Sequence, residues 1–600
     1  SIPVLSLYAD PHRVNNAEAV ADALAGFGLG TREKLLQKLH EQKHFVWLAR
    51  KLDRKTSEAI RALKFKGLGF KREDKRQYPS GTLAANILGF AGIDEEGLEG
   101  VEYEHEKTLA PIDGVKLVLS GPGGLEIPNS TVIVRPPEGG YNLCLTIDDV
   151  IQHLAEKEIQ LIFDKWQPKS CFIIVQEPKT GEILACAVRP TYDPNRYASY
   201  PSWAYKNRAV TDIYEPGSVF KVVTASAALE DKRVTPETSF HCPGFVKVYG
   251  LTMGCTGIHG TITIRQAIEK SCNAVMAKVG RLVGPESLYY YIRKFGFGEK
   301  TEIDLPGEAV GLVRLPNDWS GISSSSISIG QEIGVTGMQM VSAVSVIANG
   351  GTLVKPQIVR KVLSHDRRKV IREPQVEFKR RVVSPEVAAT MAGMMERVVV
   401  TGTGRRGKLE QYTAAGKTGT SQKLGRGEQG RKVVSFAGFA PVENPAVTIY
   451  VVVNEPKADD PKILQGGVVA APAFQNIAPN ILLYMGVPPG KVADVHSDQP
   501  TSLDVVNNRP LRRQSMAPVV TPTAVVAADE MTLGNGQMIE DPVSRVLDSA
   551  LQPLPGTAGI STPLDEAETL NDDSDIGKVI DAAVQRRYML GTSGTVTYGQ

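Results

Sequence analysis

The chain has 600 residues, of which 42% are hydrophobic and 22% charged, and a chain of this length divides into several domains because one core does not grow that large. Residues 1–486 carry 60 lysines and arginines against 51 aspartates and glutamates, whereas residues 487–600 carry 8 against 15. So weak a basic excess, with no basic residues interleaved with aromatics, argues against nucleic acid as a partner, and six cysteines are too few for a disulfide-built scaffold.

The first 64 residues alternate extended and helical patterns. Residues 16–29 and 31–42 repeat apolar residues at every third or fourth position, which predicts two helices. Residues 1–11 and 44–50 read as strands. Because the chain opens without methionine on a strand-like segment, we expect it to begin inside a domain. No apolar run reaches the roughly 18–20 residues of a membrane span, and no signal peptide is visible.

One pattern in this first part is typical of a metal site. His40, Glu41 and His44 satisfy the H-E-x-x-H spacing of zinc proteases, which requires both histidines on one continuous helix. The helical pattern fades at the motif and the next residues read as extended. We therefore favour two solvated histidines at a helix end.

In residues 76–145 many glycine and proline turns interrupt the regular helix and strand patterns of the preceding residues. A Gly-Pro-Gly-Gly segment at 121–124 lacks the lysine of a phosphate-binding loop and reads as one such turn. Together with the preceding elements, this segment predicts an irregular, elongated and non-catalytic α/β module over residues 1–148.

A second domain is predicted over residues 149–486. Residues 141–163 pass from a strand into a helix that begins near Asp148, and residues 170–190 form a hairpin. Residues 433–456 form another hairpin, which a helix follows. Because the first and last parts of the domain supply strands and a long helical insertion separates them, we predict an α+β fold with one antiparallel sheet flanked by helices.

The helical insertion begins with a serine and a lysine three residues apart. Pro216 and Gly217 precede Ser218 and an apolar run follows it, so Ser218 starts a helix and Lys221 lies one turn later on the same face. Ser-x-x-Lys spacing is common by chance, and capping the helix is the default role of such a serine. Alone, the motif does not establish catalysis.

Two later motifs change that interpretation. Ser271 and Asn273 form a Ser-x-Asn motif at the end of a helical pattern, and residues 417–420 form a Lys-Thr-Gly-Thr run among small residues. Ser-x-x-Lys, Ser-x-Asn and Lys-Thr-Gly in this order are the signature of penicillin-binding proteins and serine β-lactamases. Three motifs in the required order are far less probable by accident than one, so we predict an active site.

The residue types account for the chemistry of a serine nucleophile. A hydroxyl attacks only when a base removes its proton, and we assign this role to Lys221. A solvated lysine, with a pKa of about 10.4, is almost wholly protonated at pH 7, so burial and a nearby cation must lower its pKa. We expect Lys417 to be that cation. Asn273 is expected to hydrogen-bond Lys221 and the substrate amide, and Ser271 to pass a proton to the leaving amine.

The remaining predicted site residues hold the substrate. We expect the backbone N–H groups of Ser218 and Thr420 to form an oxyanion hole, the first assisted by the helix N-terminus. Gly419 is expected to let its strand approach the substrate backbone without a Cβ in the way. Contacts to the substrate or to a β-lactam are expected from Ser218, Asn273, Thr418 and Thr420.

The six cysteines contain no C-x-x-C pair, so we expect neither structural zinc nor thioredoxin-like chemistry. Cys242 and Cys255 flank a glycine-rich loop and either form a disulfide or stay free thiols. For His259 we favour a turn residue that caps the next helix. The sequence therefore predicts a domain without metal or other cofactor.

The chain resembles the class B penicillin-binding proteins, which are monofunctional peptidoglycan D,D-transpeptidases, over about residues 1–486. Beyond the three motifs, the resemblance rests on RQYPSGTLAANILGFAG (76–92), GLEGVEYEHEKTL (97–109), IDLPGE (303–308), SIGQEIGVTGMQM (328–340), ANGGTLVKP (348–356), TGTGRRG (401–407), SFAGFAP (435–441) and GGVVAAPAF (466–474). It implies a transpeptidase domain behind a pedestal or dimerisation-like module. The residues around Ser218 and Asn273 are similar to the cell-division branch or its sporulation relatives.

This resemblance implies a function and a location. It implies that Ser218 is acylated by a D-Ala-D-Ala stem peptide, that D-alanine leaves, and that an amine on a neighbouring strand accepts the acyl group. It also implies inhibition by β-lactams. A single membrane anchor, absent from this chain, is expected to hold the catalytic domain outside the cytoplasm, beside a polytopic lipid-II glycosyltransferase and divisome membrane proteins.

Three other activities share the same acylation chemistry. A serine β-lactamase needs a means to hydrolyse the acyl-enzyme and is a single compact domain, which the large first module disfavours. A D,D-carboxypeptidase differs only in using water as the acceptor. A penicillin-binding sensor keeps acylation but lacks turnover. We therefore favour the transpeptidase and keep these as alternatives.

Residues 487–600 contain only two aromatic residues, Tyr588 and Tyr598, among many prolines, threonines and aspartates. Such a composition buries too little apolar surface to offset chain entropy, so we predict a flexible acidic tail. Its final residues resemble a degenerate PASTA module only faintly.

Overall fold

The computed structural model describes residues 1–117, 132–423 and 430–490, and every structural statement below concerns these residues. The turn predicted at 121–124 and nearly all of the predicted tail lie outside them. Among the described residues, no helix combines the length and the apolar character that crossing a bilayer requires.

The first part of the chain forms a small three-stranded antiparallel sheet with helices packed on it. Its strand order is β2-β1-β3, so the first strand is central. Buried apolar side chains such as Leu7, Val20 and Leu35 form its core. The predicted strands and helices of residues 1–52 are confirmed. The elements are β1 (Ile2–Ala9), α1 (Ala17–Gly26), α2 (Arg32–Leu39), β2 (Val46–Leu52), α3 (Arg54–Ala62) and β3 (Leu68–Lys75).

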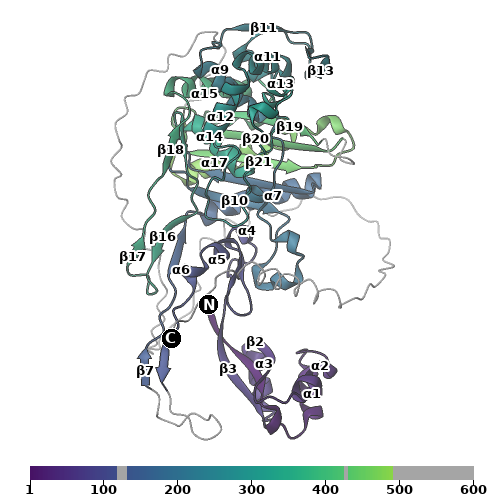
Figure 1. The fold of residues 1–600 in the computed structure, drawn as a ribbon, viewed down its shortest axis with the longest axis vertical. Helices are drawn as coiled ribbons and strands as arrows, with labels where there is room; N and C mark the ends of the chain where they lie inside the picture. The colour runs from purple at the N-terminus through teal and green to yellow at the C-terminus, as the bar shows by residue number, and fades with distance from the viewer. Residues whose placement is uncertain (118–131, 424–429, 491–600) are drawn as a thin grey trace, which may run out of the picture. The chain divides into compact units, whose positions relative to one another are not determined.

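The second part is built on a five-stranded antiparallel sheet with the order β10-β9-β21-β20-β19 (Figure 1). Its strands are β9 (Ser170–Gln176), β10 (Ile183–Arg189), β19 (Ala415–Gln422), β20 (Lys432–Ala440) and β21 (Val447–Asn454). The first and last hairpins of the domain meet where β9 pairs with β21, so the predicted α+β architecture is confirmed. Every residue of β9 and β10 is buried, because helices cover both faces of the sheet.

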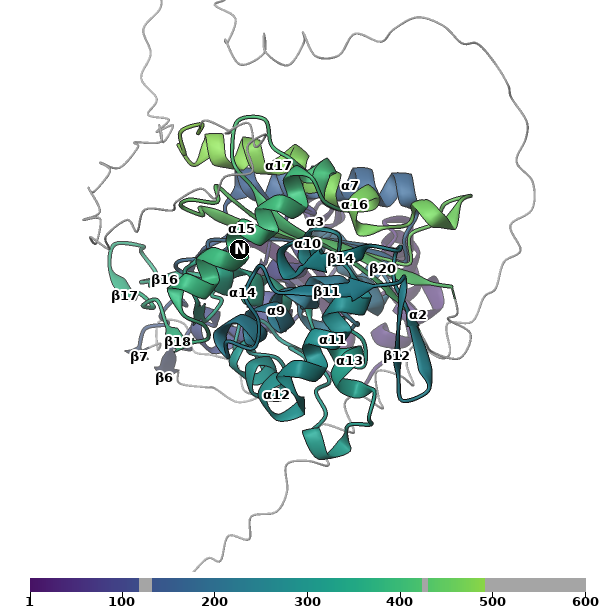
Figure 2. The ribbon, with the colours of Figure 1, turned by 90° about the horizontal axis from the view of Figure 1, so that it is seen from above.

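Two groups of helices cover the sheet. α7 (Asp149–Trp166) and α17 (Ala471–Tyr484) pack against each other on one face, and α14 (Gly337–Ala348) packs on the other (Figure 2). α7 begins at the predicted cap, where the side chain of Asp148 accepts hydrogen bonds from two backbone N–H groups. The insertion between β10 and β19 adds α9 (Lys221–Glu230), α10 (Ile264–Glu269), α11 (Asn273–Val283), α12 (Pro285–Lys294), α13 (Ser323–Ile327) and α15 (Pro385–Val400).

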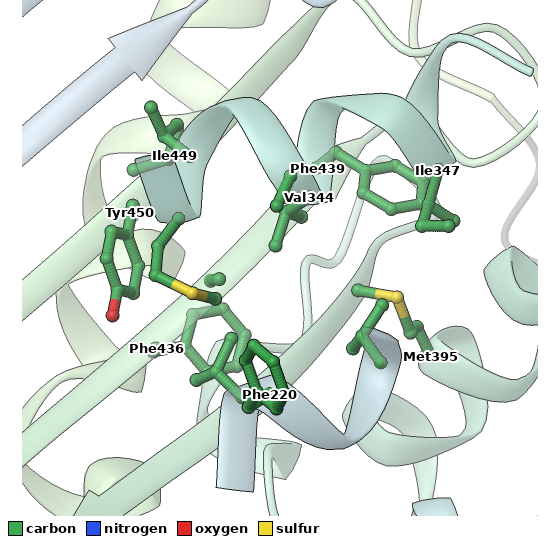
Figure 3. Close-up of a cluster of buried hydrophobic side chains, with 14 of the residues drawn as sticks. Phe220, Val344, Ile347, Met395, Phe436, Phe439, Ile449 and Tyr450 are labelled. Atoms are coloured by element: carbon green, nitrogen blue, oxygen red, sulfur yellow. The ribbon is translucent and has the colours of Figure 1, made fainter. Parts of the chain in front are cut away.

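A cluster of buried apolar side chains ties the insertion to the sheet (Figure 3). Phe220, which precedes α9, is fully buried beside Phe436 of β20. Val344 and Ile347 of α14 and Met395 of α15 complete this cluster from the helical side. Because Phe220 lies between Ser218 and Lys221, the packing that stabilises the fold also fixes the start of α9 against the sheet.

Candidate active site

Ser218 lies in a short 3-10 turn, η4 (Gly217–Phe220), that leads directly into α9. Pro216 occupies the N-cap position of this turn, so Ser218 does not cap the helix. Its side chain is half-buried, whereas Lys221 one turn later is fully buried. The start of the helix therefore presents a hydroxyl at the surface of the site and an amine beneath it.

Three hydrogen bonds hold the amine of Lys221 between the residues of the Ser-x-Asn motif. Its Nζ donates to the Asn273 Oδ1 at 2.6 Å and to the Ser271 carbonyl oxygen at 2.7 Å. It also donates to the Ser271 Oγ at 3.2 Å. The expected contact between Lys221 and Asn273 is therefore present.

Lys417 approaches the same hydroxyl from the sheet. It lies on β19, is fully buried, and its Nζ donates to the Ser271 Oγ at 2.8 Å and to the Thr418 carbonyl oxygen at 3.1 Å. The hydroxyl of Ser271 thus bridges the two lysine amines. Three segments that are distant in sequence meet at this one oxygen atom.

Burial changes the protonation of both lysines. It lowers the pKa of Lys221 to about 7, while the nearby thiols of Cys272 and Cys255 act in the opposite direction. The pKa of Lys417 is lowered well below its usual value, by burial first and then by the charge on Lys221. We expected burial and a nearby cation to act together on Lys221, and burial is the one of these two causes that lowers its pKa here. Two amines that share one buried hydroxyl do not both stay charged, so they titrate as a coupled pair.

Ser271 has an unusual backbone conformation for a non-glycine residue. It occupies the left-handed region with φ +54°, at the junction where α10 ends and α11 begins. Such a conformation costs about 1–2 kcal/mol for an L-residue and is retained where the surroundings impose it. The amide of the next residue, Cys272, donates to the Ala267 carbonyl oxygen at 2.8 Å and closes the junction.

β19 is the edge strand of the sheet and packs directly against the nucleophile turn. A Cβ on Gly419 would lie 2.2 Å from the Ser435 Oγ and 2.8 Å from the Val219 Cγ2. Glycine at 419 therefore allows β19 to approach its neighbouring strand and η4. We expected glycine here for the approach of a substrate, and the structure gives packing within the protein as the reason.

Two residues that the sequence analysis did not single out contact the Lys-Thr-Gly-Thr run. The Thr403 Oγ1 lies 2.8 Å from the Thr418 Oγ1, and the amide of Gly466 donates to the Thr420 Oγ1 at 3.2 Å. Both lie in segments that carry the family resemblance, TGTGRRG and GGVVAAPAF. Their signal was present in the sequence, but the contacts depend on how distant segments pack.

The zinc-protease pattern does not form a site. α2 ends at Leu39, so His40 follows the helix and His44 lies in the turn before β2. The ring of His44 lies against that of His12 in a tilted arrangement, and its Nδ1 lies 3.5 Å from a carboxylate oxygen of Asp10. The prediction that the two histidines do not share a helix is confirmed.

The prediction for His259 is wrong. The next helix, α10, is capped by Thr263 in a capping box with Gln266, because Thr263 lies directly before the helix and His259 does not. The imidazole of His259 instead faces two thiols, those of Cys242 and Cys255. All six cysteines are free thiols, so the disulfide alternative for Cys242 and Cys255 is not realised.

An antiparallel sheet flanked by helices, with the three motifs gathered around one buried hydroxyl, defines the class that comprises the penicillin-binding proteins and the serine β-lactamases. Comparisons with known proteins identify the family within it. Residues 171–479 match the penicillin binding protein transpeptidase domain, and residues 1–145 match the penicillin-binding protein dimerisation domain.

Individual relatives agree with this assignment. The chain is 34% identical over 495 residues to stage V sporulation protein D of Bacillus subtilis, covering 81% of this chain and 76% of that protein. It is 30% identical over 509 residues to the peptidoglycan D,D-transpeptidase FtsI of Escherichia coli, covering 82% of each. Penicillin binding protein 3 of Mycobacterium tuberculosis, solved in complex with ampicillin, matches with a TM-score of 0.63 and 33% identity over 70% of this chain and 91% of that one.

The chain therefore belongs to the penicillin-binding protein family with a transpeptidase domain and a dimerisation module. The resemblance to a class B penicillin-binding protein is confirmed.

Proposed function

We propose that the protein is a serine D,D-transpeptidase of peptidoglycan synthesis and that Ser218 carries the acyl group. The observation that carries this proposal is the buried hydrogen-bonded chain from Lys221 through the Ser271 hydroxyl to Lys417, one helical turn from Ser218. With a pKa of about 7, Lys221 is a free base in a large fraction of molecules at neutral pH. Such an amine accepts a hydroxyl proton without a large energetic cost.

Acylation follows from this geometry. As the Ser218 Oγ forms a bond to the carbonyl carbon of the D-Ala-D-Ala amide, its proton passes to Lys221 and the carbonyl electron pair moves onto oxygen. We propose that the backbone N–H groups of Ser218 and Thr420 stabilise this oxyanion. The C–N bond then breaks, and the Ser271 hydroxyl relays a proton from the lysine pair to the leaving D-alanine amine. In a β-lactam the same step opens the ring, and the leaving nitrogen stays attached to the acyl group.

Deacylation reverses these roles. An amine of a neighbouring stem peptide attacks the ester carbonyl, loses a proton to the lysine pair, and expels the Ser218 oxygen, which regains its proton. We propose that Asn273, Thr418 and Thr420 hold the peptide backbone along the open edge of β19, as an added antiparallel strand.

We further propose the setting in which the enzyme works. Residues 1–148 act as a pedestal or dimerisation-like module, residues 149–486 as the transpeptidase domain, and residues 487–600 as an acidic tail. A membrane anchor outside this chain holds the catalytic domain on the outer side of the cytoplasmic membrane, beside a polytopic lipid-II glycosyltransferase and divisome proteins. Similarity to FtsI and to stage V sporulation protein D supports a role in septal or sporulation wall synthesis.

Covalent labelling by a fluorescent penicillin tests the nucleophile and the base. Ser218→Ala should abolish labelling, and Lys221→Ala should slow it at least about a hundredfold, as expected for a removed general base. Ser226→Ala, at a serine that lies on the same helix as Lys221 and is buried like Lys221, is the matched control and should label normally. Labelling that survives Ser218→Ala would show that another residue is the nucleophile.

A second assay separates the transpeptidase from its alternatives. A D-Ala-D-Ala stem peptide incubated with an amine acceptor should give a cross-linked amide and free D-alanine. Release of D-alanine with only the hydrolysed acid would identify a carboxypeptidase instead. Acylation without turnover of any donor would identify a sensor.

A further inference from the structure

Three cysteines and one histidine converge beside the Ser-x-Asn motif. Cys242 ends β11 (Ser239–Cys242), Cys255 follows β13 (Leu251–Gly254), and His259 precedes β14 (Gly260–Thr263). Cys272 caps α11. One potential ligand atom from each of the four lies within 4.8 Å of all the others. Figure 2 shows β11, β14 and α11 close together, with the hairpin of β12 (Phe245–Val248) and β13 beside them.

We propose that these four residues bind a structural zinc ion. Zinc in such sites is tetrahedral, with bonds of about 2.3 Å to sulfur and about 2.0 Å to nitrogen, which separates the ligand atoms by roughly 3.5–3.8 Å. The Cys255 and Cys272 sulfurs are 3.6 Å apart. The His259 Nδ1 lies 3.5 Å from the Cys242 Sγ and 3.6 Å from the Cys255 Sγ. Three sulfurs and one imidazole nitrogen favour zinc over the hard cations that prefer oxygen.

Zinc binding releases protons from the cysteine ligands. Zn²⁺ displaces the protons of those ligands that are thiols, so the centre holds three thiolates and a neutral imidazole, with one net negative charge. His259 uses Nδ1 toward the metal, which leaves its proton on Nε2. No oxidant or reductant is involved, because zinc does not change its oxidation state.

Backbone N–H groups already point at two of the sulfurs. The Asn273 amide donates to the Cys255 Sγ at 3.3 Å, and the Val275 amide donates to the Cys272 Sγ at 3.4 Å. Such donors orient metal-bound thiolates and stabilise their charge. Cys242 and Cys272 are fully buried, while Cys255 and His259 are half-buried at the outer side of the cluster.

The segment between Cys242 and His259, which contains the β12–β13 hairpin, has almost no hydrophobic core of its own. Within residues 243–259, the buried apolar side chains are those of Val246 and Val248 alone. Tyr249, Leu251 and Ile258 are instead exposed, at 75%, 56% and 82%. A two-stranded hairpin with so little buried surface is marginal in water, and a metal at its base is one of the few devices that fixes such a segment.

The metal would also position the active site. Cys272 lies between Ser271 and Asn273, the two residues that contact Lys221. Two further hydrogen bonds hold Asn273. Its backbone N–H donates to the Cys255 Sγ, and its side-chain Nδ2 donates to the Gly254 carbonyl oxygen at 3.1 Å. The central residue of the motif, Cys272, and the hairpin that contacts Asn273 would therefore both be attached to the proposed zinc. This part of the inference rests on the proposed acylation chemistry, whereas zinc binding does not.

Metal analysis of the full chain tests zinc binding directly. Purified without chelator, the protein should contain about one zinc per chain. Zinc-free protein loaded with Co²⁺ should show the intense visible bands of tetrahedral cobalt and thiolate-to-metal charge transfer in the near ultraviolet. Removal of zinc by a strong chelator should lower the melting temperature by about 5 °C or more, and added Zn²⁺ should restore it.

Variants identify the ligands. His259→Gln should lose the metal, whereas His259→Cys should retain it, because four cysteines also form a tetrahedral zinc site. Cys144→Ser, at an exposed cysteine outside the cluster, and His153→Ala, at an exposed histidine on α7, are the matched controls and should keep one zinc per chain.

Acylation of the folded zinc-free protein tests the positioning role. Measured well below the melting temperature, penicillin acylation should be at least about tenfold slower without zinc, as for lost outer-shell support of a site, and zinc should restore it. An unchanged rate would limit the metal to a structural role.

Metal-free protein with four free thiols at the cluster, or a disulfide between Cys255 and Cys272 found by mass spectrometry of the alkylated protein, would overturn the proposal.

Discussion

The rate of acylation should rise with pH through the titration of Lys221. Burial lowers the pKa of its amine from the usual 10.5 to about 7. At pH 7 this raises the free-base fraction from roughly one in 3,000 to about one half, a difference of about 5 kcal/mol in the free energy of holding the amine neutral. The groups that face this amine are Lys417 on β19 and the thiols of Cys272 and Cys255.

The second-order rate constant for a fluorescent penicillin, measured between about pH 5.5 and 9, checks this prediction. The rate should fall about tenfold for each pH unit below 7 and level off above it, since only the neutral amine acts as a base. The carboxylate of the penicillin stays ionised over this range, so the profile reports on the protein. A rate that is constant from pH 6 to 8, or that is still rising tenfold per unit above pH 9, would refute the reasoning.

The lowered pKa of Lys221 also makes the stability of the protein depend on pH, and this dependence supplies a control for the rate measurements. Between about pH 7 and the unfolded pKa of Lys221, the unfolded chain binds more protons at this residue than the folded chain does. The contribution of Lys221 to the free energy of unfolding therefore increases as pH rises through that window. Melting temperatures recorded at each pH verify that the protein is folded wherever a rate is measured.

Three further predictions concern packing and boundaries. Gly419→Ala should slow acylation and destabilise the protein by about 1–3 kcal/mol, since the alanine Cβ would overlap the neighbouring strand. Gly393→Ala is the control and should not destabilise the protein, because this helical position has open space around it. Phe220→Ala should cost about 3–5 kcal/mol, and exposed Phe378→Ala about 0.5 kcal/mol or less, as measured by chemical denaturation. Truncation after residue 486 should leave penicillin labelling unchanged, and lost labelling would show that the catalytic domain extends further.

Local patterns in the sequence were sufficient to predict most elements near the ends of the catalytic domain. The alternation in residues 170–190 and 433–456 predicts two hairpins, and both exist because these strands are apolar and end at turn residues. The pairing of β9 with β21 and the edge position of β19 depend on contacts between distant segments, which periodicity does not encode.

The predicted lysine and serine contacts could be found because their motifs are compact and their chemistry is specific. In the Ser-x-x-Lys motif the base is the lysine amine one turn from the serine, so Lys221 and its two partners follow once the motifs are read together. The extent of its burial was harder to predict, since it depends on packing that the sequence does not display. Burial, one of the two causes that we expected, lowers the pKa of Lys221 to about 7.

The cysteine and histidine cluster was missed for a topological reason. Zinc sites are usually recognised by pairs of ligands on one turn, whereas here four ligands come from the ends of four different elements. Twelve residues separate Cys242 from Cys255, and twelve separate His259 from Cys272. Only the pairing of β11 with β14 and the cap of α11 bring them together.

Mass spectrometry of the intact protein after exposure to a β-lactam, followed by peptide mapping, tests the central claim most directly. We predict one acyl group per chain, attached to the peptide that contains Ser218 and stable over many minutes. An adduct on any other residue, or none on a folded protein, would contradict the proposal that the buried lysine pair activates this serine.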